Sequence, residues 1–204
     1  TSLDYRLKAL KAFREDNFVF GQLTTLHSVI GLAYQLDRVS DAEAYVREAL
    51  KLTSRLNDNY HQSLIYRVIG NHYFGRGEDE RARQYYERSL GRTDSVGYKS
   101  NAALVNNQLG RIALRGGQPV TARRHFEAAF TMGVEVENFF VQSESLYHLS
   151  LLEKMTGDNE RALDLARRSV ELVETLYADV DSSKLKGGYF SGVYERYQYY
   201  THLL

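Results

Sequence analysis

The sequence contains no cysteine, and its 26 basic side chains are balanced by 26 acidic ones. Without cysteine there is no disulfide framework, thiolate nucleophile or cysteine-ligated metal. Zero net charge also removes the broad positive field that attracts phosphate backbones, so we expect this segment not to bind nucleic acid. The hydrophobic content of 43% is still that of an ordinary folded protein.

Long apolar runs and an N-terminal targeting pattern are lacking as well. No run approaches the roughly 18 apolar residues that a membrane-spanning helix needs, and the N-terminus shows no basic segment followed by an apolar one. We therefore expect no membrane association and a cytoplasmic location. Because the chain begins at Thr1 and ends at Leu204 without a terminating signal, we interpret it as a fragment of a longer protein.

Patterns that support catalysis or cofactor binding are also missing. The sequence has no Gly-x-Ser-x-Gly elbow, and none of its six histidines belongs to a His-Glu-x-x-His pair. The segment Gly75-Arg76-Gly77 lacks the third glycine and the preceding strand of a dinucleotide site. We expect no catalytic residues, no metal and no cofactor, and therefore no enzyme activity in this segment.

The sequence does contain a 40-residue repeat. Its clearest markers are four alanines at that constant interval, Ala42, Ala82, Ala122 and Ala162. Small, apolar or aromatic residues recur four, seven and eight positions after each alanine, which is one face of a helix. Five residues before three of the alanines lie Gly77, Gly117 and Gly157, where a left-handed turn between two helices is predicted. Helical hairpins that pack on one another follow from this pattern.

The second repeat carries a family resemblance in Ile69-Gly70-x2-Tyr73, Gly77 and Ala82-x3-Tyr86. This pattern resembles the tetratricopeptide repeat, which implies an all-α, right-handed superhelical solenoid of antiparallel helix hairpins. The family's usual period is about 34 residues. Here no proline ends the second helix, so each hairpin can be longer.

The register divides the chain into consecutive segments. Since Gly31 lies only eleven residues before Ala42, the loop of the first hairpin is predicted to be one residue shorter than the others. Residues 1–17 are a second helix without its partner, so self-association through uncovered repeat ends is possible. The predicted segments are a truncated repeat at 1–17, four repeats at 18–57, 58–97, 98–137 and 138–180, and a tyrosine-rich capping helix at 181–204 whose packing face holds Phe190, Tyr194, Tyr197 and Leu204.

The tetratricopeptide resemblance also implies a binding groove lined by the first helices. Asparagine bonds both donors and acceptors of a peptide, and arginine can hold a carboxylate in a fork. We therefore predict a protein or peptide ligand, the alternative being that these side chains are only solvated. The predicted ligand residues are Arg67, Asn71, Asn107, Arg111, Tyr147 and Lys154, with Ser28, Leu32 and Gln35 at the matching positions of the first repeat.

The C-terminal part carries a second resemblance, in Val173-Glu174-Thr175-Leu176, in residues 186–193 and in residues 197–204. It is similar to the linker that precedes CHAT domains, which are caspase-like modules. That resemblance implies a recognition or regulatory arm of a larger multidomain protein. Two alternatives are a sensor array of a bacterial transcriptional regulator or signalling adaptor, and a structural spacer. The sequence beyond Leu204 would separate these alternatives.

Overall fold

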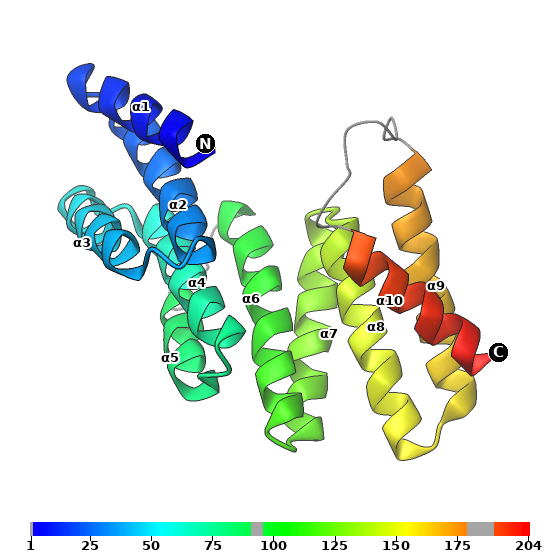
Figure 1. The fold of residues 1–204 in the computed structure, drawn as a ribbon. Coiled ribbons are helices and arrows are strands. Elements are labelled where there is room, and N and C mark those ends of the chain that lie inside the picture. The colour runs from blue at the N-terminus through cyan, green and yellow to red at the C-terminus, as the bar shows by residue number, and fades with distance from the viewer. Residues whose placement is uncertain (1, 91–95, 179–189) are drawn as a thin grey trace. The chain divides into compact units, whose positions relative to one another are not determined.

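The computed structural model describes residues 2–90, 96–178 and 190–204, in which every regular element is an α-helix (Figure 1). The chain forms two compact units, Thr1–Asp94 and Ser95–Leu204. Within each unit the helices pack as antiparallel hairpins, which confirms the predicted all-α solenoid class. Unit 1 contains α1 (Ser2–Glu15), α2 (Val19–Gln35), α3 (Val39–Leu56), α4 (Asn59–Gly75) and α5 (Asp79–Leu90); unit 2 contains α6 (Val96–Arg115), α7 (Pro119–Glu135), α8 (Phe139–Thr156), α9 (Asn159–Ala178) and α10 (Phe190–Leu203).

Residues in the left-handed backbone conformation follow the helix ends at regular intervals along the chain. Each interval equals half of the sequence repeat, or a multiple of that half. In each of these turns an amide bonds back to a carbonyl five residues earlier, as from Glu78 to Tyr73 at 3.0 Å and from Gln118 to Ala113 at 2.9 Å. This is the Schellman bond, which satisfies carbonyls left over at a helix end. The predicted glycine turns are confirmed, and the left-handed positions are Asn17, Asp37, Asn57, Gly77, Gly117, Glu137 and Gly157.

The first hairpin does not have a shorter loop, and that prediction is wrong. The left-handed Asp37 lies one full repeat before Gly77, and three residues separate α2 from α3 just as three separate α4 from α5. The error came from aligning Gly31 with Gly70. The structural equivalent of Gly70 is Ile30, which is fully buried.

A small residue on the first helix lies directly under an aromatic ring of the second helix in the two central hairpins. A Cβ atom added to Gly70 would lie 2.6 Å from the Tyr86 ring, and one added to Gly110 would lie 2.5 Å from the Phe126 ring. Both rings are fully buried. In the first hairpin the larger side chain belongs to the first helix instead: Ile30 of α2 shares its core cluster with the smaller Val46 of α3.

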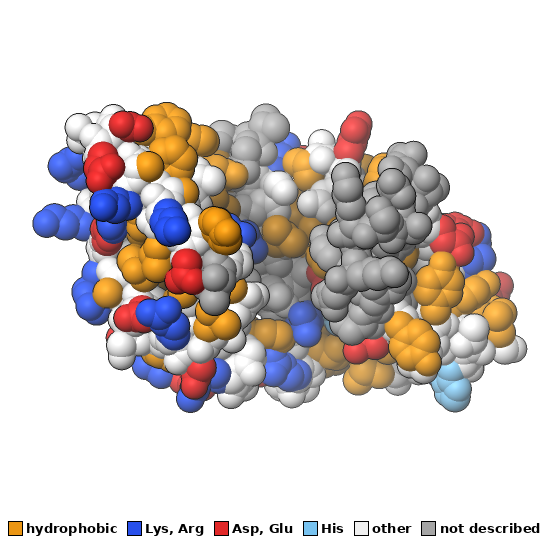
Figure 2. All heavy atoms as spheres, turned by 45° about the horizontal axis from the view of Figure 1, so that its top comes forward, with side chains coloured by type: hydrophobic (Ala, Val, Ile, Leu, Met, Phe, Trp, Pro, Cys, Tyr) orange, Lys and Arg blue, Asp and Glu red, His pale blue; other side chains and the backbone are white. Residues whose placement is uncertain are grey.

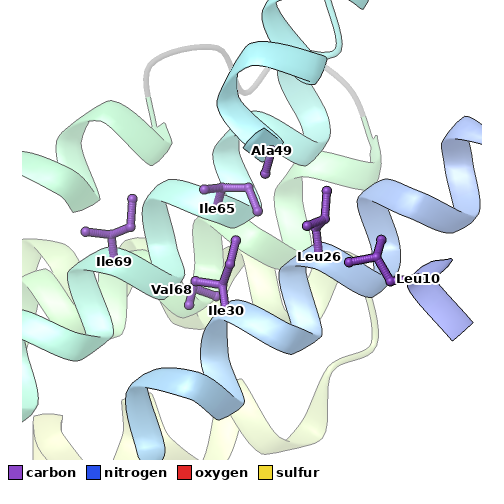
Figure 3. Close-up of a cluster of buried hydrophobic side chains, with 7 residues drawn as sticks. All are labelled: Leu10, Leu26, Ile30, Ala49, Ile65, Val68 and Ile69. Carbon is purple, nitrogen blue, oxygen red and sulfur yellow. The ribbon is translucent and has the colours of Figure 1, made fainter. Parts of the chain in front are cut away.

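The core of unit 1 consists of buried aliphatic side chains from α1, α2, α3 and α4 (Figure 3). Leu10 of α1 is fully buried against Leu26 and Ile30 of α2, so α1 belongs to the packed unit. Burial of each such side chain contributes roughly 1.5–3 kcal/mol before the entropy cost of folding. The register alanines Ala42, Ala82, Ala122 and Ala162 have no exposed surface.

Unit 2 adds α10 to two complete hairpins. The helix packs against α9, and from the predicted face the half-buried Tyr197 donates its hydroxyl to Glu174 of α9 at 2.9 Å, whereas Tyr194 is 62% and Leu204 is 78% exposed. The prediction is therefore wrong for Tyr194 and Leu204, and the most buried described side chain of the helix is Arg196, at 6% exposed. The Phe190 side chain lies outside the described residues, as does the stretch 179–189, which includes most of the glycine-rich part of the CHAT-linker resemblance.

The glycine and aromatic pairs predict the effect of adding one methyl group. Gly110→Ala should lower the free energy of unfolding by about 1–3 kcal/mol, because the buried Phe126 ring cannot move away from the new Cβ. Gly31→Ala is the matched control: its nearest neighbour would be Val68 at 3.8 Å, so it should raise stability by about 0.5–1 kcal/mol through helix propensity. Urea denaturation of both variants measures this, and equal changes would contradict the packing described.

Candidate functional site

A polar cleft of about 690 Å³ opens in unit 1 between α1, α2 and α4. Two of the predicted ligand residues, Arg67 and Asn71, line it. So do Ser28, Leu32 and Gln35 of the first repeat. The remaining lining residues are Ser2, Arg6, His27, Gly31, Tyr34, Asp37, Val68, His72, Gly75 and Arg76.

Arg67 and Asn71 lie one helical turn apart on α4. The Tyr86 hydroxyl donates to Asn71 Oδ1 at 2.8 Å, which fixes the orientation of the amide and leaves its Nδ2 donor for other partners. Burial lowers the pKa of the Arg67 guanidinium, although Tyr86 and Tyr60 act in the opposite direction. Arginine stays charged even so, so α4 presents a cation and an amide to the cleft.

His27 occupies the position on α2 that Arg67 occupies on α4, one repeat later. Its Nε2 atom is buried and makes no hydrogen bond within the described residues. Burial, together with the charge of Arg67 and the neighbouring His61, lowers the pKa of His27 to about 4. The imidazole is therefore neutral at pH 7, and one polar atom beside the cleft lacks a partner.

Tyr34 and His72 form an aromatic pair on the cleft. Their rings stack with centroids 4.0 Å apart and an interplanar angle of 19°. Burial raises the pKa of Tyr34 to about 12, with Tyr73 and Glu43 adding to the effect. Burial also lowers the pKa of His72, and the charge of Arg76 does so too. Both rings are thus neutral near pH 7, and they provide a flat surface next to polar groups.

Two of the four remaining predicted ligand residues, Asn107 and Arg111, interact with Glu144 in unit 2. Asn107 is 1% exposed; its Nδ2 donates to the Val141 carbonyl at 3.3 Å and its Oδ1 accepts from the Ser145 hydroxyl at 2.8 Å. Burial raises the pKa of Glu144, while the charges of Arg111 and Arg196 and a hydrogen bond from Asn107 oppose that rise. Asn107 and Arg111 thus interact with a half-buried acid of the chain itself.

The third of these four residues, Tyr147, contacts α10. The Tyr199 ring meets the Tyr147 ring edge-on, with centroids 5.5 Å apart, and the Arg196 guanidinium lies 6.0 Å from the Tyr147 centroid. Lys154, the last predicted ligand residue, lies at the end of α8 and donates to Asn159 Oδ1 at 2.9 Å in the turn. The structure therefore places Tyr147 under α10 and Lys154 at a hairpin end.

Sequence reasoning did not single out His27, Tyr34 or Glu144. The alanine register would have placed His27 in line with Arg67, but the glycine alignment chose Ser28 in its place. Glu144 is the single acidic residue of α8 before Glu153. An isolated acid within a stretch of uncharged residues was the available signal for a buried ionic contact.

The described residues offer no metal site, since no group of three or more His, Asp or Glu side chains lies close enough together there. Within that same part of the chain, no helix has the length and apolar content to cross a membrane. Figure 2 shows Lys and Arg side chains mixed with Asp and Glu side chains on the face it displays. Specific recognition would therefore depend on local groups such as those of the cleft.

Comparison with known proteins places the hairpins of unit 1 in a recognised class. Residues 21–95 match the family model described as tetratricopeptide repeat, which supports a tetratricopeptide-type protein. The chain is 22% identical over 180 residues to the regulatory protein RapG of Bacillus subtilis (strain 168), covering 87% of the chain and 42% of RapG. It thus spans about two fifths of the length of the curated relative it matches.

A solved structure supports the same fold. The crystal structure of BtubC (BKLC) from P. vanneervenii matches with a TM-score of 0.78 at 15% identity, covering 98% of this chain and 81% of BtubC. At that identity the likeness shows the fold alone. The comparisons do not bear on the predicted CHAT-domain association, which stays a prediction.

The buried His27 predicts a pH dependence for the stability of unit 1. An unfolded histidine titrates near pH 6.5, whereas the pKa of His27 in the fold is about 4, so the unfolded state binds more protons between these values. Stability is then lost as the pH falls below 6.5, by about 2 kcal/mol at pH 5. His27→Gln should remove this loss of stability, and urea denaturation at pH 7 and pH 5 measures the difference. An identical pH dependence in the two chains would contradict the assignment.

Proposed function

We propose that this chain is a non-catalytic scaffold that binds a protein or peptide segment in the cleft of unit 1. The observation that carries the proposal is the combination, in one cleft of about 690 Å³, of the Arg67 cation, the oriented Asn71 amide and the stacked pair Tyr34–His72. Peptide sites generally combine apolar or aromatic surface with a few placed polar groups.

The charge of the cleft favours a ligand segment that carries a carboxylate. Arg6, Arg67 and Arg76 line it, against the single acid Asp37, and of these arginines Arg76 is paired with Glu78 at 3.0 Å. A carboxylate near Arg67 would complete a fork of hydrogen bonds, and the Asn71 amide could donate to a peptide carbonyl. The ligand class that follows is an extended acidic peptide, or the C-terminus of one.

A regulatory role is supported by the likeness to RapG, whose name describes a regulatory protein. We infer that the chain is the recognition or regulatory arm of a larger protein, either beside a CHAT domain or as the sensor array of a transcriptional regulator or signalling adaptor. A structural spacer is the remaining alternative, and the polar cleft favours binding over it. In this proposal the six predicted groove residues form two sets, Arg67 and Asn71 in unit 1 and Asn107, Arg111, Tyr147 and Lys154 in unit 2.

Replacement of the cleft arginine tests the proposal. Arg67→Ala should weaken binding of the best-bound acidic peptide at least tenfold, because a charge-assisted fork is worth about 1.5–3 kcal/mol. A fluorescent peptide library of matched acidic and basic sequences supplies the ligand, and anisotropy gives Kd. Arg47→Ala, at an exposed position of α3 outside the cleft, makes the same change in charge and should leave Kd unchanged.

Two results would count against the proposal. If no library peptide binds the wild-type chain, the spacer alternative is favoured. If acidic peptides bind but Arg67→Ala and Arg47→Ala weaken them equally, the chain attracts acidic peptides by general charge, and the cleft is not their site.

A further inference from the structure

Helix α10 packs against α9, and two of its side chains also reach α8. Arg196 places its guanidinium 5.8 Å from the Phe140 ring and 6.0 Å from the Tyr147 ring. One turn further on, Tyr199 meets Tyr147 edge-on at 5.5 Å, and its hydroxyl lies 3.4 Å from the Ser150 hydroxyl. Phe140, Tyr147 and Ser150 are seven and three residues apart and therefore lie on one side of α8.

An acidic side chain of α8, Glu144, lies beside these contacts and interacts with the buried arginine. Glu144 lies one turn from Phe140 and from Tyr147 on the same helix, and the charges of Arg196 and Arg111 both act on its carboxyl group. A cation held over aromatic rings with a carboxylate nearby is stabilised by both contacts. The complementarity explains why Arg196, and not an apolar residue, is buried here.

The contact of α10 differs from those inside the hairpins. Arg196 is the single buried side chain among residues 194–204, where Tyr194 and Leu204 are largely exposed. The hairpins of unit 2, by contrast, share a core of fully buried residues such as Ala122, Phe126 and Leu152. A helix of 14 residues is marginal by itself, so α10 depends on its contacts with α8 and α9.

We propose that the face of α8 formed by Phe140, Glu144, Tyr147 and Ser150 is a docking surface for a helix that carries an arginine followed three residues later by a tyrosine. In this chain α10 occupies that surface through Arg196 and Tyr199, and it can leave without unfolding the hairpins. A partner helix with the same arginine and tyrosine spacing then competes with α10 for the surface. The proposal rests on the proposed function only in treating Tyr147 as a ligand residue.

Hydrogen exchange on the whole chain tests whether α10 leaves. When a segment opens locally, its amides exchange with solvent without global unfolding of the chain. The amides of residues 194–203 should exchange at least tenfold faster than those of α8 and α9 under native conditions. Equal protection of α10 and α8 would overturn the proposal, because α10 would then open only when the whole unit unfolds.

A labelled peptide of residues 190–204 tests the surface itself. The chain with Arg196→Ala and Tyr199→Ala, which removes the α10 side chains that contact α8, should bind this peptide at least tenfold more tightly than wild type. Tyr194→Ala is the control, since this side chain is exposed, and it should bind as wild type does. Adding Glu144→Gln to the double variant should weaken the peptide again by at least tenfold.

The results separate this proposal from the proposed function. A double variant that keeps its melting temperature but binds no peptide overturns the docking surface, whatever happens at the cleft. If the double variant fails to fold, α10 is an integral part of unit 2, and the proposal is equally overturned. Failure of Arg67→Ala to affect acidic peptides would leave both results untouched, because Arg67 is in the other unit.

Discussion

The two helices of each hairpin fill one shared volume between them, and the rest of each unit depends on that constraint. Gly70 and Gly110 leave room for the rings of Tyr86 and Phe126, whereas the larger Ile30 is accompanied by the smaller Val46. In a close-packed interior, two large residues at such a pair of positions would clash and two small ones would leave a cavity. The helix spacing set in this way also positions the cleft, because the Tyr86 ring packs on Gly70 and its hydroxyl orients Asn71.

The fold could be predicted because the residues that mark it in the sequence are required by their small size. Alanines that recur once in every repeat must be buried where helices touch, and glycines at the turns adopt left-handed φ at little cost, so both could be read without coordinates. The same reasoning failed where a turn uses another residue. Asp37 takes the left-handed conformation in the first hairpin, and relying on Gly31 there shifted the expected site from His27 to Ser28.

The site was less predictable because its chemistry depends on pairs from different helices. Arg67 and Asn71 were found from the family register, but the register says nothing about which cation meets an acid. In unit 2 Arg111 and Arg196 act on Glu144, whereas the cleft of unit 1 has an excess of arginine over acid. An apolar face on α10 was also expected, but the side chain that α10 buries is Arg196, which lies near the rings of Phe140 and Tyr147 of α8. Such contacts depend on side chains from two helices, so they cannot be predicted from the sequence of either helix alone.

The left-handed turn residues also restrict how such a chain can change in length. The turns are separated from one another by whole numbers of half-repeats, and an α-helix rotates by about 100° per residue. One residue inserted within a helix would therefore turn every later side chain of that helix away from its partner, taking an alanine such as Ala82 out of the interface. Insertions in this chain are therefore tolerable within the turns or as whole hairpins, but not as single residues inside a helix.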